Sequence, residues 1–323
     1  MKRTMLITAA LFIFQLASGR TSLAEDQNRD MVYSTYGTIV KGIEAAFDPS
    51  YITFTGGLNW SDSIDNDDLL YEARIAVHFP WINNCKKDSP RCTRDDVFRL
   101  YAPIRLQVRQ YTSDSSPVST PSYNPGLRLY YWNTSWVNVG KELHSVHYLS
   151  LGVHHYSNGQ SGEHYTGGAI NTKDGSFSLD YVELAYYYET IDKEGGPDDW
   201  WKVNVRKYLT GWTWESPQHD YYEKWLFEAS RKKRLNRYGI TTQLTAGYKH
   251  DRTYVSPGDN ASFRDNMQYT AEAFIPVKCP KVRFFHWDNM SVYLRWDKGY
   301  DYYNINYQNR INRLQAGLVT GVF

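Results

Sequence analysis

The chain has 323 residues, and its 36 lysines and arginines nearly balance its 35 aspartates and glutamates, giving a formal net charge of +1. This balance gives no sign of the basic surface that a nucleic-acid partner requires. Aromatic residues are abundant, with 28 tyrosines and 11 tryptophans. The aromatic girdles of a membrane barrel use such residues, and so do soluble carbohydrate-binding β proteins.

The amino terminus has the three parts of a secretory signal peptide. Two basic residues precede an apolar run over residues 5–16, and Ser22-Leu23-Ala24 fits a small-x-small cleavage site. We expect cleavage after Ala24, with the small residues at 17–19 as the second choice. Residues 1–24 are then the signal peptide, and residues 25–323 form a single domain that begins with a polar, loose segment over 25–30.

The three cysteines fall into a pair and a single residue. Cys85 and Cys92 flank a short polar loop, and an exported protein meets an oxidising environment in which such a pair forms a disulfide. We therefore expect a local disulfide between Cys85 and Cys92 and a free thiol at Cys279.

Alternating polar and apolar residues, separated by turn-rich stretches, fill the chain from residue 51 onwards. No stretch after the signal peptide approaches the ~20 apolar residues of a spanning helix. In a strand every second side chain lies on one face, so these segments predict two-faced strands. The predicted strands, about a dozen, are 51–59, 69–80, 97–112, 124–134, 144–158, 176–191, 201–211, 220–231, 237–250, 262–278, 290–304 and 309–323.

The polar faces of these strands are heavily charged, as Glu72, Arg74 and His78 show on the second strand. A soluble sandwich would expose such charges to water, whereas a small membrane barrel encloses them and turns its apolar face to lipid. Many of the strands exceed five or six residues and match the ~9–11 residues of a tilted membrane strand. We predict an all-β fold, a closed antiparallel transmembrane barrel of about 12 strands with a polar, side-chain-filled interior.

Residues 224–237 allow two interpretations. They form either a basic amphipathic helix or two strands joined by a charged turn around Lys232-Lys233-Arg234. We prefer the two strands.

Two strands carry polar residues on faces that are otherwise apolar. His155 and Ser157 continue the face of Leu149, Leu151 and Val153, and Asp180 shares the face of Val182 and Leu184. Polar groups on an apolar face are costly, so their presence there needs a reason.

The three residue types match nucleophilic catalysis. A histidine two residues from a serine on one strand face can take the proton of the hydroxyl, and a carboxylate can orient the imidazole. Ser157, His155 and Asp180 fit these roles, and the N–H of Gly159 is free to approach an oxyanion. His154 points to the interior by the same alternation and is assigned to the barrel charges. An isolated His-x-Ser is most often a pair of ordinary strand residues.

At these residues the sequence resembles the outer-membrane phospholipase A family of Gram-negative bacteria. The match comprises His155-x-Ser157-Asn158-Gly159 followed by Ser176-x-Ser178-x-Asp180. Further matches are Ser115-Ser116-Pro117 with Tyr123-x-Pro125 and residues 127–129, and, more loosely, residues 301–306. The signal peptide, the strand count and the terminal Phe323 agree, although Phe323 falls out of phase with its strand.

The resemblance implies a twelve-stranded barrel that hydrolyses acyl esters of phospholipids (A1/A2 type) at a lipid-facing site and depends on calcium. Ser157 is then the nucleophile and His155 the base. Asp180 stands where the family usually has asparagine. The implied calcium ligands are the Ser115 side chain, the Gln160 carbonyl and the Ser176 hydroxyl, with Ser115 supplied by the partner of a homodimer. Calcium and the Gly159 N–H would form the oxyanion hole.

The loop between Ser157 and Asp180 is longer than the family's, by an insertion over residues 163–171. Glu163 and Asp174 are further calcium candidates, although acidic loop residues are usually only solvated. Asn171 is the rival of Asp180 for orienting His155, but it lies outside the matching motif.

The sequence therefore predicts a calcium-dependent phospholipase of the bacterial outer membrane. The alternative is a non-catalytic barrel, porin-like or structural, although about twelve strands enclose too narrow an interior for a wide pore. A soluble exported β-sandwich is a distant third.

Overall fold

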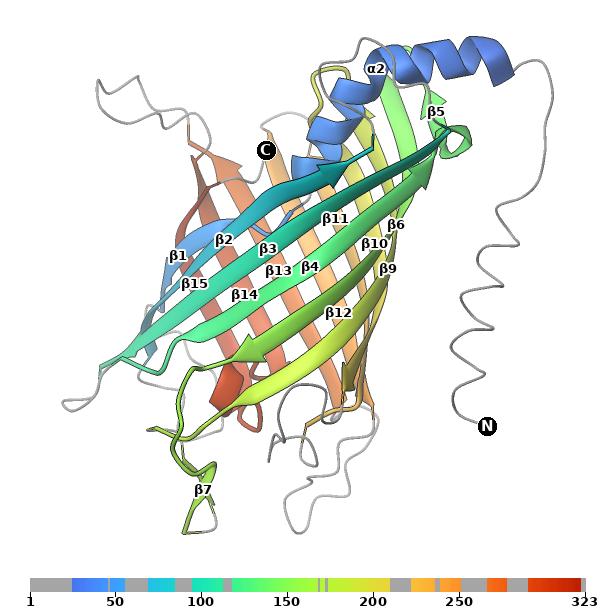
Figure 1. Cartoon of the computed structure of the whole chain (residues 1–323). Helices are drawn as coiled ribbons and strands as arrows, with labels where there is room; N and C mark the ends of the chain where they lie inside the picture. The colour runs from blue at the N-terminus through green and yellow to red at the C-terminus, as the bar shows by residue number, and fades with distance from the viewer. Residues whose placement is uncertain are drawn as a thin grey trace.

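The computed structural model describes residues 25–45, 47–55, 69–84, 95–112, 118–167, 169–171, 174–209, 222–235, 239–250, 266–277 and 290–320. Within them one antiparallel sheet closes into a barrel, because strand β4 at one end of the strand order also pairs with β6 (Figure 1). The short strand β5 pairs only with β6, which leaves twelve strands in the wall. The predicted all-β barrel is confirmed. In these described parts no helix is long and apolar enough to span a membrane.

Each of the twelve wall strands overlaps one predicted strand. Their bounds are β1 Ser50–Phe54, β2 Leu69–Asn83, β3 Asp96–Tyr111, β4 Ser122–Asn133, β6 Leu143–Ser157, β9 Ser178–Asp192, β10 Pro197–Leu209, β11 Trp225–Leu235, β12 Ile240–His250, β13 Met267–Pro276, β14 Met290–Tyr300 and β15 Arg310–Thr320. The smaller strands are β5 Val137–Val139, β7 Tyr165–Thr166 and β8 Ala169–Ile170, and Thr134–Trp136 and Asn304–Asn306 form 3-10 turns.

The apolar residues of the alternating pattern face outwards. On β2, Ile75 and Phe79 are more than half exposed, whereas Glu72, which lies on the opposite face of the same strand, is fully buried. On β6, Leu151 is exposed while its neighbours Gly152 and Ser150 are buried. A wall that exposes its apolar face and buries its charged face is the arrangement of a membrane barrel.

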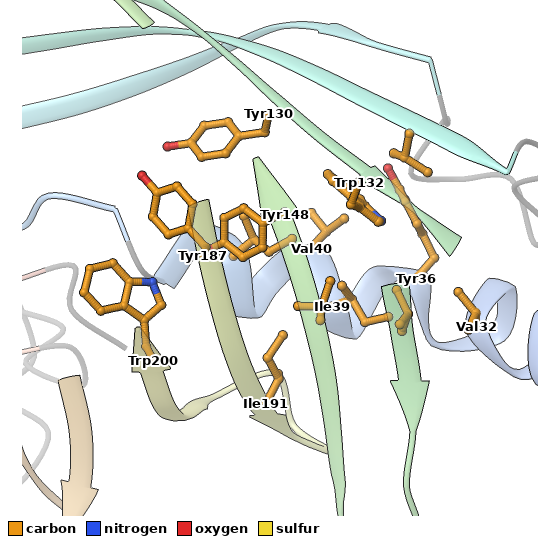
Figure 2. Close-up of a cluster of buried hydrophobic side chains, with 14 of the residues drawn as sticks. Val32, Tyr36, Ile39, Val40, Tyr130, Trp132, Tyr148, Tyr187, Ile191 and Trp200 are labelled. Carbon is orange, nitrogen blue, oxygen red and sulfur yellow. The ribbon is translucent and has the colours of Figure 1, made fainter. Parts of the chain in front are cut away.

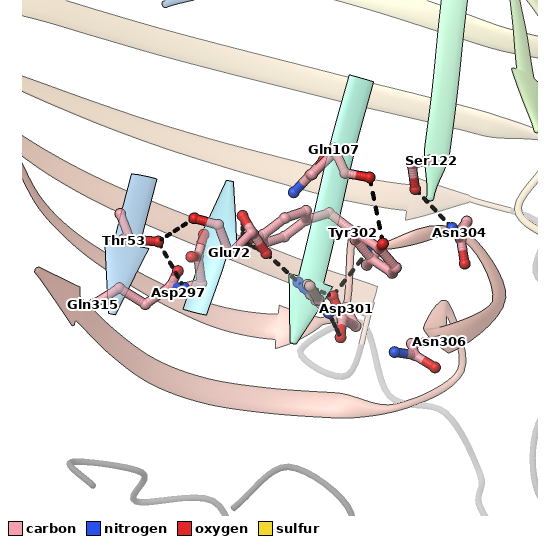
Figure 3. A network of polar contacts seen from close by, with 12 residues as sticks. Thr53, Glu72, Gln107, Ser122, Asp297, Asp301, Tyr302, Asn304, Asn306 and Gln315 are labelled. Carbon is pink, nitrogen blue, oxygen red and sulfur yellow. Dashed lines mark hydrogen bonds and ion pairs between the residues drawn. The ribbon is translucent and has the colours of Figure 1, made fainter. Parts of the chain in front are cut away.

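The barrel interior is filled by paired charges (Figure 3). Arg109 lies 2.6 Å from both Glu72 and Asp301, and the side chains of all three are fully buried. Tyr302 donates a hydrogen bond of 2.8 Å to Glu72. Buried charges need such partners because an unpaired charge in a low-dielectric interior is strongly unfavourable. Segment 301–306, which follows β14, therefore folds back into the barrel.

Helix α2 (Glu25–Ala45) lies across the end of the barrel at which β1 begins and β15 ends (Figure 1). Tyr36, Ile39 and Val40 are buried with Trp132 and Ile191 on inward positions of the wall (Figure 2). The prediction of a loose segment over residues 25–30 is wrong. Its polar residues form the first turns of a helix whose later turns supply the apolar contacts.

Strand β11 corrects the expected turn around Lys232. The strand continues through this residue to Leu235, so both the turn and the alternative helix are wrong. Two of the charged side chains have partners on other strands. Arg231 lies 2.8 Å from Asp199 on the adjacent strand β10, and Arg234 lies 2.7 Å from Asp192 at the end of β9, one strand further on. Lys232 points inwards and is buried. Cross-strand partners therefore stabilise a run of four basic residues in a strand.

The signal peptide over 1–24, the cysteines Cys85, Cys92 and Cys279, and Phe323 lie outside the described residues. The single domain over 25–323 stays a prediction.

Candidate active site on the outer wall

The register of β6 and β9 places His155 directly opposite Asp180. His155 Nδ1 lies 2.9 Å from Asp180 Oδ1, at hydrogen-bonding distance. Both residues stand on the outward face, with side chains that are 30% and 14% exposed. A carboxylate accepts, so Nδ1 is the donor and Nε2 is left as the acceptor of the ring.

Ser157 lies two residues beyond His155 on the same face of β6 and is half-buried. It pairs in register with Ser178 on β9 and with Tyr123 on β4. The three residues predicted from the sequence therefore come from two neighbouring strands and share one patch of the outer wall.

Asn158 anchors the turn that follows Ser157, a role that the sequence analysis missed. The residue is only 1% exposed. Its Oδ1 accepts hydrogen bonds from the N–H groups of Phe177 (2.9 Å) and Gln160 (3.2 Å), and its Nδ2 donates to the Gly175 carbonyl (2.8 Å). An asparagine side chain offers both an acceptor and donors, so it can hydrogen-bond to the turn after Ser157 and to the returning segment at the same time. Its place directly after His155-x-Ser157 in the motif was the available signal.

Gly159 has a φ of +67°, in the left-handed region where a side chain is disfavoured. A Cβ at this position would lie 3.3 Å from the Tyr123 ring. The turn therefore needs glycine both for its backbone conformation and for its close approach to Tyr123.

The two segments that carry Gln160 and Ser176 lie side by side. Gly162 and Gly175 form a bridge, and Ser176 N–H donates to the Gly162 carbonyl at 2.8 Å. Gln160 and Ser176 thus lie on adjoining segments, and carbonyl and hydroxyl oxygen atoms suit calcium. Ser115 lies outside the described residues. Among the described residues no three histidine, cysteine, aspartate or glutamate side chains form a metal-binding group.

The inserted loop forms a small hairpin of β7 and β8 over a buried histidine. His164 Nδ1 lies 3.0 Å from the Ser176 carbonyl, and its ring stacks on Tyr307 at 6.2 Å between centroids. Burial lowers the pKa of His164 below its usual value, against the opposing effect of the Ser176 carbonyl. This contact ties the insertion to a candidate calcium ligand.

Asn171 and Asp174, two of the other candidates, contact each other within the loop. Asn171 Nδ2 donates to the Glu163 carbonyl at 3.1 Å and to Asp174 Oδ1 at 2.7 Å. Asp180 is in hydrogen-bonding contact with His155, and Asn171 is held in the inserted loop. The structure therefore places Asp180 at the imidazole.

The interior side of the same wall is braced by the segment after β14. Tyr156, between His155 and Ser157, donates a hydrogen bond of 2.9 Å to the Tyr302 carbonyl and accepts one of 2.6 Å from the Asn304 N–H. His154 also points inwards, stacked on Tyr181 at 4.9 Å between centroids. His154 thus belongs to the interior, as predicted.

Two solved structures share this architecture. Outer membrane phospholipase A from Escherichia coli superposes with a TM-score of 0.55 at 16% identity, over 88% of this chain and 97% of that chain. The fold is that of outer membrane phospholipase A. The Salmonella typhi outer membrane phospholipase dimer with bound calcium gives the same TM-score, identity and coverage.

No protein-family model matches the sequence, and no curated protein matches it significantly. At 16% identity the structural likeness shows the fold alone.

Proposed function

We propose that the chain is a calcium-dependent phospholipase of the bacterial outer membrane, with Ser157, His155 and Asp180 as its catalytic residues. The observation that carries the proposal is the 2.9 Å contact of His155 with Asp180 on the outward face of the barrel. An interior ion pair would be ordinary in such a barrel, but a His–Asp pair on the lipid-facing side is not.

The proposed reaction uses the two ring nitrogens of His155 differently. Nδ1 donates to Asp180, and Nε2 takes the proton of Ser157 as its oxygen attacks the acyl carbonyl. His155 then returns this proton to the leaving lysophospholipid oxygen, and a second round with water releases the fatty acid. The N–H of Gly159 stabilises the oxyanion. The surrounding bilayer supplies the substrate directly to the wall.

The proposed calcium ligands are the Gln160 carbonyl and the Ser176 hydroxyl, with Ser115 from the partner of a homodimer. The bridged segments around Gly162 and Gly175 supply neutral oxygen donors, which fit a hard cation of flexible geometry. Bound calcium would add positive charge beside the developing oxyanion. The Salmonella typhi dimer with bound calcium supports both the metal and the homodimer as proposals for this chain.

The test is ester hydrolysis of dispersed phospholipid by the purified barrel, with calcium and with a chelator. Ser157→Ala should abolish hydrolysis. Ser178→Ala, which changes the serine opposite Ser157 in the register, is the matched control and should leave the rate within a few-fold of the wild type. Equal activity of Ser157→Ala and the wild type would refute the proposal.

A further inference from the structure

A hollow lies on the outer wall over β9 to β12, away from the candidate active site. Its volume is about 500 Å³, within the ~300–1,000 Å³ range of small-molecule sites. The strand register shows how it is built, because two rows of directly paired residues cross the wall here. One row is Leu149, Tyr186, Val203, Ala229 and Ala246, and the next is Leu151, Leu184, Val205, Phe227 and Tyr248.

Small side chains make this hollow. Ala229 and Ala246 pair across β11 and β12, and Tyr186, Phe227 and Tyr248 stand beside them. The surface offered is almost wholly apolar and faces outwards. Its shape and polarity suit a flexible hydrocarbon chain.

The row that borders the hollow on the side of α2 is polar and aromatic. It runs His147, Tyr188, Trp201 and Arg231 across four strands. Arg231 lies 4.6 Å from the centroid of the Trp201 ring and 2.8 Å from Asp199.

Two residues further along β11, Lys233 is exposed on the same face. This edge of the hollow therefore carries two cations against one carboxylate.

The apolar part of the outward face is short on β10. On β10 only Val203 and Val205 separate Trp201 from Lys207 on the outward face, and Lys207 lies 4.1 Å from the Trp225 ring centroid. Six residues of strand span roughly 20 Å, less when tilted, compared with an apolar band of about 25 Å in other barrels.

On β3, by contrast, the outward residues from Phe98 to Val108 are all apolar. Lipid beside β10 and β11 must thin to match the short span, which brings its phosphate layer down to Arg231.

We propose that the hollow and the cationic edge form a binding site for one anionic phospholipid. An acyl chain lies over Ala229 and Ala246, and the phosphate is held by Arg231 and Lys233 with Trp201 at the interface. Charge complementarity favours an anionic lipid, since the edge carries a net positive charge. The site is independent of the proposed catalysis.

The experiment measures lipid retained by the detergent-solubilised barrel in native mass spectrometry. The probe is ether-linked phosphatidylglycerol, which an ester hydrolase cannot cleave, so the outcome does not depend on the proposed activity. Arg231→Gln combined with Lys233→Gln removes the charge, and Ala229→Phe fills the hollow. Both should lower the apparent affinity about tenfold or more, which equals ~1.4 kcal/mol.

Two matched controls change the same residue types elsewhere on the outward face. Lys298→Gln on β14 and Ala102→Phe on β3 should bind like the wild type. Heat-dependent mobility in gels verifies that each variant is folded, and Ala229→Phe decides the question if the double variant is not. Retention that is equal in all variants, or absent from the wild type, would overturn the site.

Discussion

His155 Nδ1 lies 2.9 Å from Asp180 Oδ1, on two strands that pair these residues directly across the barrel wall. On one side their neighbours on the same face are Val153 and Val182, which pair with each other, and on the other side they are Ser157 and Ser178. A carboxylate beside apolar residues is costly unless a partner stabilises its charge. The contact with His155 therefore explains the position of Asp180 on this face, and replacing Asp180 tests its effect on His155.

Replacing Asp180 should separate orientation from charge. Asp180→Ala leaves the imidazole without its acceptor, and kcat/KM for phospholipid should fall by about 10²–10⁴-fold, the usual worth of a positioned acid–base group. Asp180→Asn keeps an oxygen that can accept from Nδ1 and should retain more activity than alanine. Steady-state hydrolysis measures both. Wild-type activity in Asp180→Ala would exclude Asp180 as the orienting group.

Removing the Asn158 side chain should loosen the turn that carries Gly159. Asn158→Ala removes the side-chain partner of the buried Phe177 N–H and of the Gly175 carbonyl. Each unsatisfied group should lower the free energy of unfolding by about 1–3 kcal/mol. We expect lower stability in denaturant and faster hydrogen exchange of residues 158–177. Asn138→Ala on β5, an exposed asparagine, is the control and should change neither. Unaltered exchange in Asn158→Ala would show that the amide does not anchor the turn.

The inserted loop should lose stability as the pH falls. The pKa of His164 is lowered in the folded loop by burial, so the unfolded loop binds a proton at a higher pH than the folded loop does. The stabilisation is fully present above the unfolded value of about 6.5 and declines as the pH falls through the folded value. Hydrogen exchange of residues 160–177, corrected for intrinsic rates, measures it. His164→Gln should remove the dependence, and an identical pH profile in both proteins would contradict the explanation.

Breaking the buried charge cluster should destabilise the whole barrel. Arg109→Leu leaves Glu72 and Asp301 without their cation, and such a loss costs about 3–5 kcal/mol. Arg310→Ala changes an exposed arginine at the start of β15 and should cost under about 1 kcal/mol. Equilibrium unfolding of the refolded barrel in detergent compares them. Similar losses for the two variants would show that Arg109 is not a central support.

The barrel and the facing pair His155 and Asp180 could be predicted because both depend on a period of two. Alternation assigns each side chain to a face, so it separated His155 from His154 and Asp180 from Glu183 without any coordinates. Contacts between distant segments have no such period. Arg109 and Asp301 are 192 positions apart, and nothing in the sequence pairs them.

The missed elements have local physical causes. A turn was expected around Lys232 because four basic residues in a row repel each other, but Asp199 on β10 and Asp192 at the end of β9 pair with two of them. Helix α2 was not predicted because the residues of its first turns are polar, and the apolar residues that pack against the barrel end occur only in its later turns. The hydrogen bond of Asn158 with the Phe177 N–H joins residues 19 positions apart, which the loop between them brings together.

The most direct test of the proposed mechanism is the identity of the serine that becomes covalently modified. A long-chain sulfonyl fluoride should react with the nucleophile in the presence of calcium, and peptide mass spectrometry locates the adduct. We expect a single adduct on Ser157 that His155→Ala abolishes. An adduct on Ser178 instead, or a reaction at Ser157 that does not need His155, would contradict it.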